Sequence, residues 1–210
     1  MKLYTYFRSS AAYRVRIALN LKGVAYESVP VNLLKGEQRD PQYGAINPQH
    51  RVPALDIGGT ILIQSPAILE YLDEAYPDPP FLPFGAILRA KVRAVASLIG
   101  CDIHPLNNSG VLSYLKNQLG QDQSARDAWY AHWIRMGFNA VEALIEPGPF
   151  AFGARPSLAD IYLVPQVFNA RRFDISLSDY PKIASVDVAC SKLPAFEKAA
   201  PARQADAVET

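Results

Sequence analysis

Three short segments in the first 65 residues carry the side chains that could do chemistry in this chain. Ser9-Ser10 precedes a helical pattern, Val52-Pro53 opens a strand pattern, and Gln64-Ser65 opens a second helical pattern. A helix N-terminus exposes unpaired N–H groups and a partial positive charge, which stabilise a bound thiolate or carboxylate. The backbone at a strand edge can pair with an extended peptide. The three segments therefore indicate a binding site for a small, anionic, peptide-like thiol.

The thiol has to come from a ligand, because no cysteine falls in these segments. The two cysteines of the chain are Cys101 and Cys190, and neither has CxxC spacing or belongs to a metal-type cluster. We therefore expect no bound metal. This cysteine usage is also typical of the reducing environment of the cytoplasm.

Each segment also has a purely structural interpretation. Ser9 and Ser10 could only cap a helix, and Ser65 could cap another. Pro53 could be an ordinary trans proline at the start of a strand. A cis Val52-Pro53 bond would instead turn the preceding N–H and C=O groups toward a peptide ligand, and the sequence leaves the isomer open. The ligand interpretation gains weight because all three segments fall on the matching elements of one fold.

That fold is an α/β thioredoxin-like domain, which we predict over residues 1–80. It follows from hydrophobic periodicity and from turn residues such as Gly58-Gly59. The expected elements, in chain order, are a strand at 2–6, a helix from Ser9-Ser10 to Gly23, a strand at 26–31, a short helix within 32–47, hairpin strands at 52–57 and 60–63, and a helix with Ser65 as its N-cap and Pro66 at its first position.

A proline-rich linker separates this domain from an all-α domain, which we predict over residues 87–210. Ser157 and Asp160 form a capping-box pattern before one of its helices. From Ala199 onward the chain has few large apolar side chains, so we expect a frayed tail. Two apolar stripes at helical spacing predict buried helix faces: Leu88, Val92, Val95, Ile99 and Ile103 in one, and Trp129, Trp133, Met136, Ala140 and Leu144 in the other.

Composition excludes several functional classes. The chain has 210 residues, a formal net charge of +1 and 50% hydrophobic residues. A chain with this charge lacks the basic surface of a nucleic-acid-binding protein. No apolar run approaches the roughly 18 to 20 residues of a membrane span, and the N-terminus has a strand pattern rather than that of a signal peptide. We expect no nucleic-acid partner and no membrane association.

Beyond the three segments, further motifs make the chain similar to one family. These motifs are Tyr13-Arg14-Val15-Arg16-Ile17-Ala18-Leu19, Asn47-Pro48, Val52-Pro53-Ala54-Leu55, Gln64-Ser65-Pro66-Ala67-Ile68, Ile103-His104-Pro105-Leu106, Leu163-Val164-Pro165-Gln166-Val167 and Asn169-Ala170-Arg171-Arg172-Phe173. With these motifs the chain resembles the glutathione transferases nearly end to end. The resemblance is strongest to the zeta class, which includes maleylacetoacetate isomerases and glutathione-dependent maleylpyruvate isomerases.

The resemblance implies a cofactor and roles for individual residues. The cofactor would be glutathione, with its sulfur near Ser9 and Ser10 and its other contacts at the remaining binding positions. The implied binding residues are Ser9, Ser10, Val52, Gln64, Ser65, His104 and Asn108. Ser9, Ser10 and Arg8 would be the catalytic residues, while Arg8 and Arg172 would present cations to substrate carboxylates. The class usually has a cysteine where this chain has Ala11.

Two arginines compete for the substrate role at the end of the last motif. Arg171 and Arg172 are adjacent, and one of them could only neutralise the C-terminus of its helix. The resemblance favours Arg172.

By resemblance, the expected function is glutathione-dependent cis–trans isomerisation of a maleyl-type diketo acid, in aromatic catabolism. The substrate would be maleylpyruvate or maleylacetoacetate, the product its fumaryl isomer, and the enzyme a cytoplasmic homodimer. Two alternatives remain open: a general glutathione transferase that conjugates electrophiles, and a non-catalytic glutathione-binding interaction module.

Overall fold

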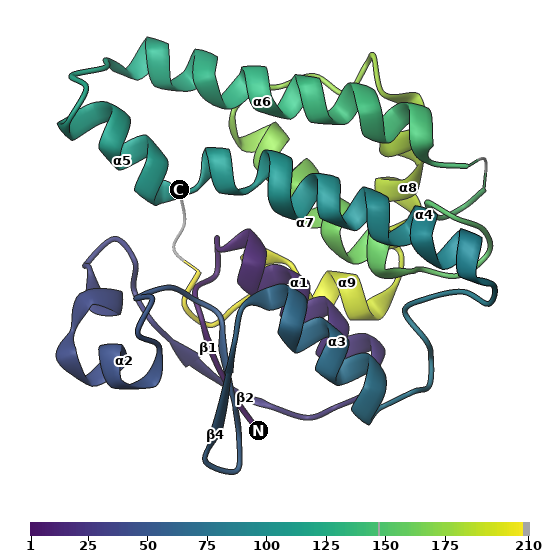
Figure 1. Ribbon diagram of the computed structural model, residues 1–210, viewed down its shortest axis with the longest axis horizontal. Helices are drawn as coiled ribbons and strands as arrows, with labels where there is room; N and C mark the ends of the chain where they lie inside the picture. Colours follow the sequence, from purple (N-terminus) through teal and green to yellow (C-terminus); the bar gives the residue numbers. More distant parts are fainter. Residues whose placement is uncertain (147, 208–210) are drawn as a thin grey trace. The chain divides into compact units, whose positions relative to one another are not determined.

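The computed structural model describes residues 1–146 and 148–207, which form two compact units (Figure 1). One unit consists of Met1–Pro80 together with the segment that begins at Ser191, and the other is Phe81–Cys190. This division differs from the expected one of 1–80 and 87–210, because the segment after Cys190 belongs to the first unit.

The first unit is built on a four-stranded mixed sheet with the strand order β2-β1-β3-β4. The strands are β1 (Lys2–Thr5), β2 (Glu27–Pro30), β3 (Ala54–Ile57) and β4 (Thr60–Ile63). β1 runs parallel to β2 and antiparallel to β3, and β3 and β4 form a hairpin. Gly58 and Gly59 both have positive φ in its turn, 63° and 98°, which glycine adopts without steric cost. This order of elements confirms the predicted thioredoxin-like domain.

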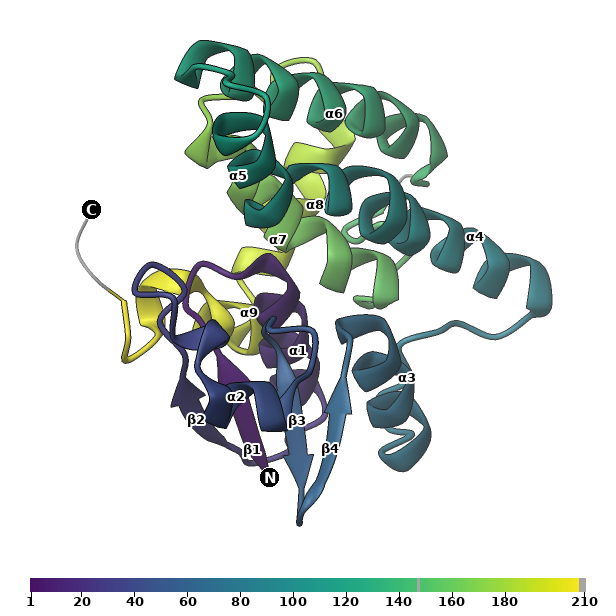
Figure 2. The same ribbon diagram turned by 60° about the vertical axis from the view of Figure 1, so that its left-hand side comes forward.

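Three α-helices precede the linker in this unit. They are α1 (Ser10–Leu21), α2 (Pro41–Ile46) and α3 (Ser65–Ala75), with a 3₁₀ turn, η1 (Glu37–Arg39), before α2. α1 and α3 lie together on one side of the sheet and α2 lies on the other (Figures 1 and 2). The N-termini of α1 and α3 are the two helix ends that the sequence singles out.

The start of α3 differs from the prediction. Ser65 is the first helical residue rather than the N-cap, and Gln64 takes the N-cap position with a φ of 70°. Pro66 is consequently the second helical residue. The Gln64 side chain makes no capping hydrogen bond, so it is available for other contacts.

Arg16 is fully buried in α1 and organises the chain around it. Its guanidinium donates to Thr5 Oγ1 at 3.0 Å, Tyr6 O at 3.3 Å, Phe7 O at 3.0 Å and Ala199 O at 2.9 Å. Burial lowers its pKa to about 10, so the side chain remains protonated at neutral pH. A buried charge of this kind is tolerated because its donors are hydrogen-bonded.

Residues 191–207 form ordered structure, which corrects the expectation of a frayed tail from Ala199 onward as far as Ala207; residues 208–210 lie outside the described residues. Helix α9 (Pro194–Ala199) packs on α1, and a 3₁₀ turn, η4 (Pro201–Arg203), follows. Ala199 and Pro201 are buried. The small side chains there do not weaken the packing, because the contacts come from helix docking and from the Arg16 hydrogen bond to the Ala199 carbonyl.

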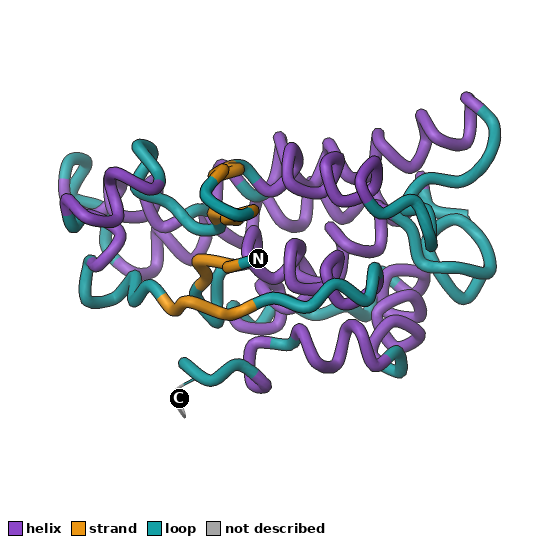
Figure 3. The backbone as a smooth tube through the Cα atoms, turned by 90° about the horizontal axis from the view of Figure 1, so that it is seen from below, coloured by secondary structure: helices purple, strands orange, loops and turns teal. Residues whose placement is uncertain are grey.

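The second unit is helical apart from one isolated bridge between Phe150 and Gly153 in its described part, whereas the four strands belong to the first unit (Figure 3). Ser157 and Asp160 form the predicted capping box. Among the described residues, no helix combines the length and apolar character that a membrane crossing requires. The elements are α4 (Ala86–Ser97), the π-helical η2 (Leu98–Ile103), η3 (Pro105–Asn107), α5 (Ser109–Asn117), α6 (Gln123–Leu144), α7 (Leu158–Arg172) and α8 (Pro181–Ser191).

The first predicted stripe is buried except at Leu88, which is partly exposed, and the second stripe is offset. Val92, Val95, Ile99 and Ile103 are all inaccessible to solvent. On α6, however, Met136 and Leu144 are about half exposed, at 49% and 48%. The buried face of α6 consists of Tyr130, Ile134, Gly137, Phe138 and Val141. Gly137 selects this face, because a Cβ at this position would overlap Ile103.

We predict that Arg16→Met lowers the free energy of unfolding by about 3 to 5 kcal/mol, because it leaves several buried acceptors unsatisfied. Urea unfolding measures the change. Arg39→Met removes an exposed arginine of the same unit and should stay within about 0.5 kcal/mol of the wild type. Equal effects of the two substitutions would contradict the role of Arg16.

Candidate active site

Ser9 is the N-cap of α1. Its Oγ accepts a hydrogen bond from the Ala12 N–H at 3.2 Å, which confirms that Ser9 caps the helix. This bond uses the oxygen as an acceptor and leaves the hydroxyl proton available for donation to a ligand. Ser9 is partly exposed, whereas Ser10, the first residue of α1, is only 5% exposed. Ser9 is therefore the more accessible of the two predicted sulfur donors.

Arg8 lies directly before this cap and is partly exposed. Its guanidinium carbon is 5.0 Å from the centroid of the Phe7 ring, a cation–π distance. Arg8 Nη2 also lies 3.5 Å from the Tyr6 hydroxyl, to which it donates. The side chain is thus held by aromatic neighbours that do not neutralise its charge.

A buried arginine lies behind the N-terminus of α3. Arg14, on α1, is 2% exposed and donates from Nη1 to Ser65 Oγ at 3.5 Å. Ser65 itself is 4% exposed. The positive end of α3 is therefore reinforced by a cation, which suits a bound carboxylate.

Gln64 joins this helix end to the loop before β3. Its Nε2 donates to Gln49 Oε1 at 2.5 Å. In the same loop, the Tyr43 hydroxyl and Asn47 Nδ2 both donate to the Arg51 carbonyl, at 2.7 Å and 2.6 Å. Burial raises the pKa of Tyr43, so its hydroxyl stays protonated and remains a donor.

Val52 follows this loop, and its peptide bond to Pro53 is cis. Val52 lies just before β3, outside the paired residues of the sheet. Its side chain belongs to a buried cluster that also contains the residues before Arg8. The cluster consists of Tyr6, Phe7, Val31, Tyr43 and Val52.

Contacts within the first unit link the elements that carry the three sequence segments. Arg14 of α1 donates to Ser65 at the start of α3, Gln64 donates to Gln49 in the loop before β3, and Val52 packs with Tyr6 and Phe7, which precede α1. Two helix N-termini and one strand-edge backbone are the donors and acceptors that an anionic, peptide-like thiol requires.

The remaining predicted site residues, His104, Asn108 and Arg172, belong to the second unit. His104 lies between η2 and η3, and its backbone N–H donates to the Ile99 carbonyl. Asn108 is the N-cap of α5: its Oδ1 accepts from the N–H groups of Gly110 and Val111, and its Nδ2 donates to the Pro105 carbonyl. Both ends of the Asn108 amide thus have a structural use.

Arg171 and Arg172 are distinguished by their partners. Arg171 forms an ion pair with Asp187 at 2.7 Å. The Arg172 guanidinium lies 5.6 Å from the Phe173 ring centroid, and Phe173 stacks on Tyr130 at 3.6 Å. Burial raises the pKa of Tyr130 to about 12, while the Arg172 charge acts in the opposite direction. Arg171 is thus engaged by a carboxylate, and the choice of Arg172 as the substrate cation stays a prediction.

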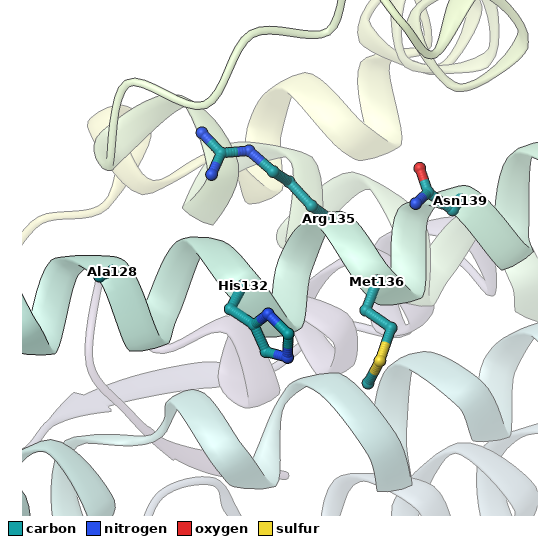
Figure 4. A pocket seen from close by; sticks show the side chains of 5 residues that line it. All are labelled: Ala128, His132, Arg135, Met136 and Asn139. Atoms are coloured by element: carbon teal, nitrogen blue, oxygen red, sulfur yellow. The ribbon is translucent and has the colours of Figure 1, made fainter.

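One open hollow lies elsewhere and contains none of the predicted site residues. It has a volume of about 430 Å³ and is lined from a single helix, α6, by Ala128, His132, Arg135, Met136 and Asn139 (Figure 4). His132 and Met136 point to one side of the helix, Arg135 and Asn139 to the other. A surface lined by residues of a single helix does not enclose a ligand, so we do not assign the site to it. Among residues 1–146 and 148–207, no group of three or more His, Cys, Asp or Glu side chains could hold a metal ion.

Sequence reasoning gave no role to Arg14 or Arg16, although both support the site. Their position was the available signal. Both arginines lie on a face of α1 whose other residues are apolar or small, and charged residues are almost never buried without partners. Two of their partners, Ser65 and Ala199, lie far along the chain and could not be read from local spacing.

Comparison with known proteins identifies the family. Residues 1–74 match the model of the glutathione S-transferase N-terminal domain, and residues 123–186 match that of the C-terminal domain. The chain belongs to the glutathione S-transferase family.

Three relatives of this transferase illustrate the similarity. Maleylacetoacetate isomerase of Pseudomonas aeruginosa is 53% identical over 98% of both chains. The holo structure of maleyl pyruvate isomerase, described as a bacterial glutathione S-transferase of the zeta class, is 52% identical, with a TM-score of 0.97 over 99% of this chain and 100% of that one. Maleylacetoacetate isomerase from Methylobacterium extorquens AM1, solved with bound malonate and glutathione, is 37% identical, with a TM-score of 0.96 over 100% of both chains. The predicted zeta-class membership and two-domain transferase fold are confirmed.

Proposed function

We propose that this transferase is a glutathione-dependent cis–trans isomerase of a maleyl-type diketo acid. The observation that carries the proposal is the accessible Ser9 hydroxyl at the N-terminus of α1, in a unit that has no cysteine in residues 1–80. The similarity to isomerases over the whole chain supports the same conclusion. The substrate class is maleylpyruvate or maleylacetoacetate, since relatives of nearly equal identity carry each name.

The donor set of the first unit fits glutathione. Its γ-glutamyl carboxylate suits the N-terminus of α3, where Gln64 and Ser65 lie with Arg14 behind them. Its cysteinyl backbone suits the Val52 backbone before β3, and its thiol suits the Ser9–Ser10 helix end. We propose His104 and Asn108 as further contacts; the two capping bonds use both lone pairs of Asn108 Oδ1, so its remaining capacity is the second hydrogen of Nδ2, a donor.

Bound glutathione would supply a thiolate that adds reversibly to the alkene, so that the former double bond can rotate before the thiolate leaves. Ser9, assisted by Ser10, would donate a hydrogen bond to the sulfur and favour its anionic form, as does the positive end of α1. Ala11 in place of the class cysteine leaves this work to the two hydroxyls and the helix end.

The chain's cations have two tasks in this reaction. Negative charge develops on the substrate carbonyl oxygen during addition, and a fixed cation or N–H group stabilises it. The terminal carboxylates must also stay anchored while the centre of the molecule rotates. Arg8 and Arg172 are the proposed cations, and the malonate in a relative supports a site for a dicarboxylate.

We further propose that the enzyme is a cytoplasmic homodimer. Both described cysteines are free thiols, which suits a reducing compartment. The side chains of Phe84 and Ile87, at 97% and 79% exposure, are apolar surface that a second copy could cover.

The proposal predicts that the wild-type enzyme isomerises maleylpyruvate or maleylacetoacetate only when glutathione is added, and that glutathione is not consumed. Parallel assays with both substrates, with and without glutathione, measure this. Rapid conjugation of aromatic electrophiles without isomerisation would support a general transferase instead. Glutathione binding without either reaction would support a non-catalytic module.

We predict that Ser9→Ala lowers turnover by about 10² to 10³-fold, as loss of one hydrogen-bond donor to a reacting anion typically does. Its stability should fall by only about 1 kcal/mol, the usual value of an N-cap. Asp122→Ala is the matched control, because Asp122 caps α6 through the Ala125 N–H. Comparable turnover in the two variants would show that Ser9 is only a cap.

Arg172→Gln should raise KM for the maleyl substrate by about 10 to 100-fold, the value of a lost hydrogen bond to a charged group. KM for glutathione should change little. Steady-state kinetics with each substrate varied in turn separates the two constants. Arg171→Gln removes the neighbouring charge, which pairs with Asp187, and should leave both constants unchanged. If Arg171→Gln produced the larger increase, the assignment of the two arginines would be reversed.

A further inference from the structure

Residues 204–207 lie against the β1–α1 loop (residues 6–9), which carries Arg8 and Ser9. Asp206 Oδ2 accepts a hydrogen bond from the Phe7 N–H at 2.9 Å, across 199 positions of sequence. Ala207 packs against the cluster that contains Tyr6 and Phe7. Asp206 is partly buried, so this bond is shielded from competing water.

Both backbone polar groups of Phe7 are hydrogen-bonded. Its N–H donates to Asp206, and its carbonyl accepts from Arg16 Nη2 at 3.0 Å. The preceding carbonyl, of Tyr6, accepts from Arg16 Nη1 at 3.3 Å and from the Ser9 N–H at 3.0 Å. The backbone that enters the N-cap of α1 is thus fixed by one buried cation and one carboxylate.

Arg8 and Ser9 take their positions from this backbone. Ser9 is two residues after Phe7, and the Arg8 guanidinium stacks over the Phe7 ring at 5.0 Å. Catalytic groups misplaced by about 1 Å can lose a factor of 10² in rate. A carboxylate that fixes the Phe7 peptide therefore controls groups that it does not touch.

We propose that Asp206 is a positioning residue of the active site, which holds the Phe7 N–H and thereby places Arg8 and Ser9 toward the thiol and the substrate. The proposal rests on the proposed function for these two residues. Under this proposal, residues 204–207 support the active site although none of their groups takes part in the reaction.

The hydrogen bond and the charge of Asp206 can be separated by substitution. Asp206 also interacts electrostatically with the buried Arg16 guanidinium. Asp206→Asn keeps an oxygen acceptor for the Phe7 N–H and removes the charge. Asp206→Ala removes both. Since the proposal depends on the hydrogen bond, the Asn variant should retain most of the function.

The first readout needs neither glutathione nor substrate. Hydrogen exchange of the Phe7 amide, measured in the ligand-free enzyme, should become faster in Asp206→Ala and remain close to the wild type in Asp206→Asn. Equal protection of this amide in the wild type and in Asp206→Ala would overturn the contact on which the proposal stands.

The second readout concerns the site. In Asp206→Ala we expect kcat to fall by about 10 to 100-fold, with little change in KM for glutathione. The pH at which bound glutathione ionises, followed by thiolate absorbance in the ultraviolet, should rise. Asp206→Asn should remain within about fivefold of the wild-type kcat, because a neutral acceptor is somewhat weaker than a charged one.

The matched control is Arg203→Ala, which breaks an exposed ion pair with Glu197 in the same segment. It should leave kcat, thiol ionisation and Phe7 exchange unchanged. A lower melting temperature in Asp206→Ala with wild-type kcat and thiol ionisation would reduce Asp206 to a structural role and overturn the proposal. So would an Asn variant as impaired as the Ala variant. If the wild type neither binds glutathione nor isomerises maleyl acids, the proposed function fails, whereas the exchange result stands by itself.

Discussion

The first unit depends on one buried cation, Arg16. Placing a guanidinium in the protein interior is unfavourable unless its donors are satisfied, and here they bind four acceptors from two separate parts of the chain, residues 5–7 and Ala199. β1, the β1–α1 loop and α9 must therefore converge on α1. The packing of apolar side chains tolerates small displacements, whereas a multidentate arginine does not. The geometry of the helix end that we propose for sulfur binding follows from this requirement.

The proposed chemistry places an external thiol at a helix N-terminus where a thioredoxin-like fold can carry a cysteine of its own. A helix N-terminus in a thioredoxin-like sheet can lower the pKa of a thiol, and the chain here provides hydroxyls at that end instead of a thiol. A hydroxyl can donate to a sulfur anion but cannot replace it, so the reactive atom is external. The proposed cations are Arg8 and Arg172. The neighbouring Arg171 forms an ion pair with Asp187.

Local rules predicted the parts of the fold that local interactions determine. The Ser9 cap, the Gly58-Gly59 hairpin and the Ser157 capping box each involve residues within a few positions of one another. The failures involve contacts between distant residues. The buried face of α6 depends on Gly137 meeting Ile103, and the order after Ala199 depends on a hydrogen bond to Arg16. At α3, the left-handed conformation of Gln64 moved the helix start by one residue, which composition alone does not indicate. The three binding segments were indicated by their positions at helix and strand starts, whereas Arg8, His104, Asn108 and Arg172 were reached through family resemblance. The contacts of all these residues became known only from the structure.

The first unit is discontinuous in sequence, with the whole of Phe81–Cys190 inserted between its two parts. During synthesis, residues 1–80 leave the ribosome well before α9 exists, so α1 initially lacks the helix that covers it and Arg16 lacks one acceptor. The second unit, being contiguous, can fold in the meantime. The β1–α1 loop is made early, but its hydrogen bond to Asp206 cannot form before that residue has been made. The nascent chain therefore keeps the proposed sulfur site incomplete until translation has passed Asp206.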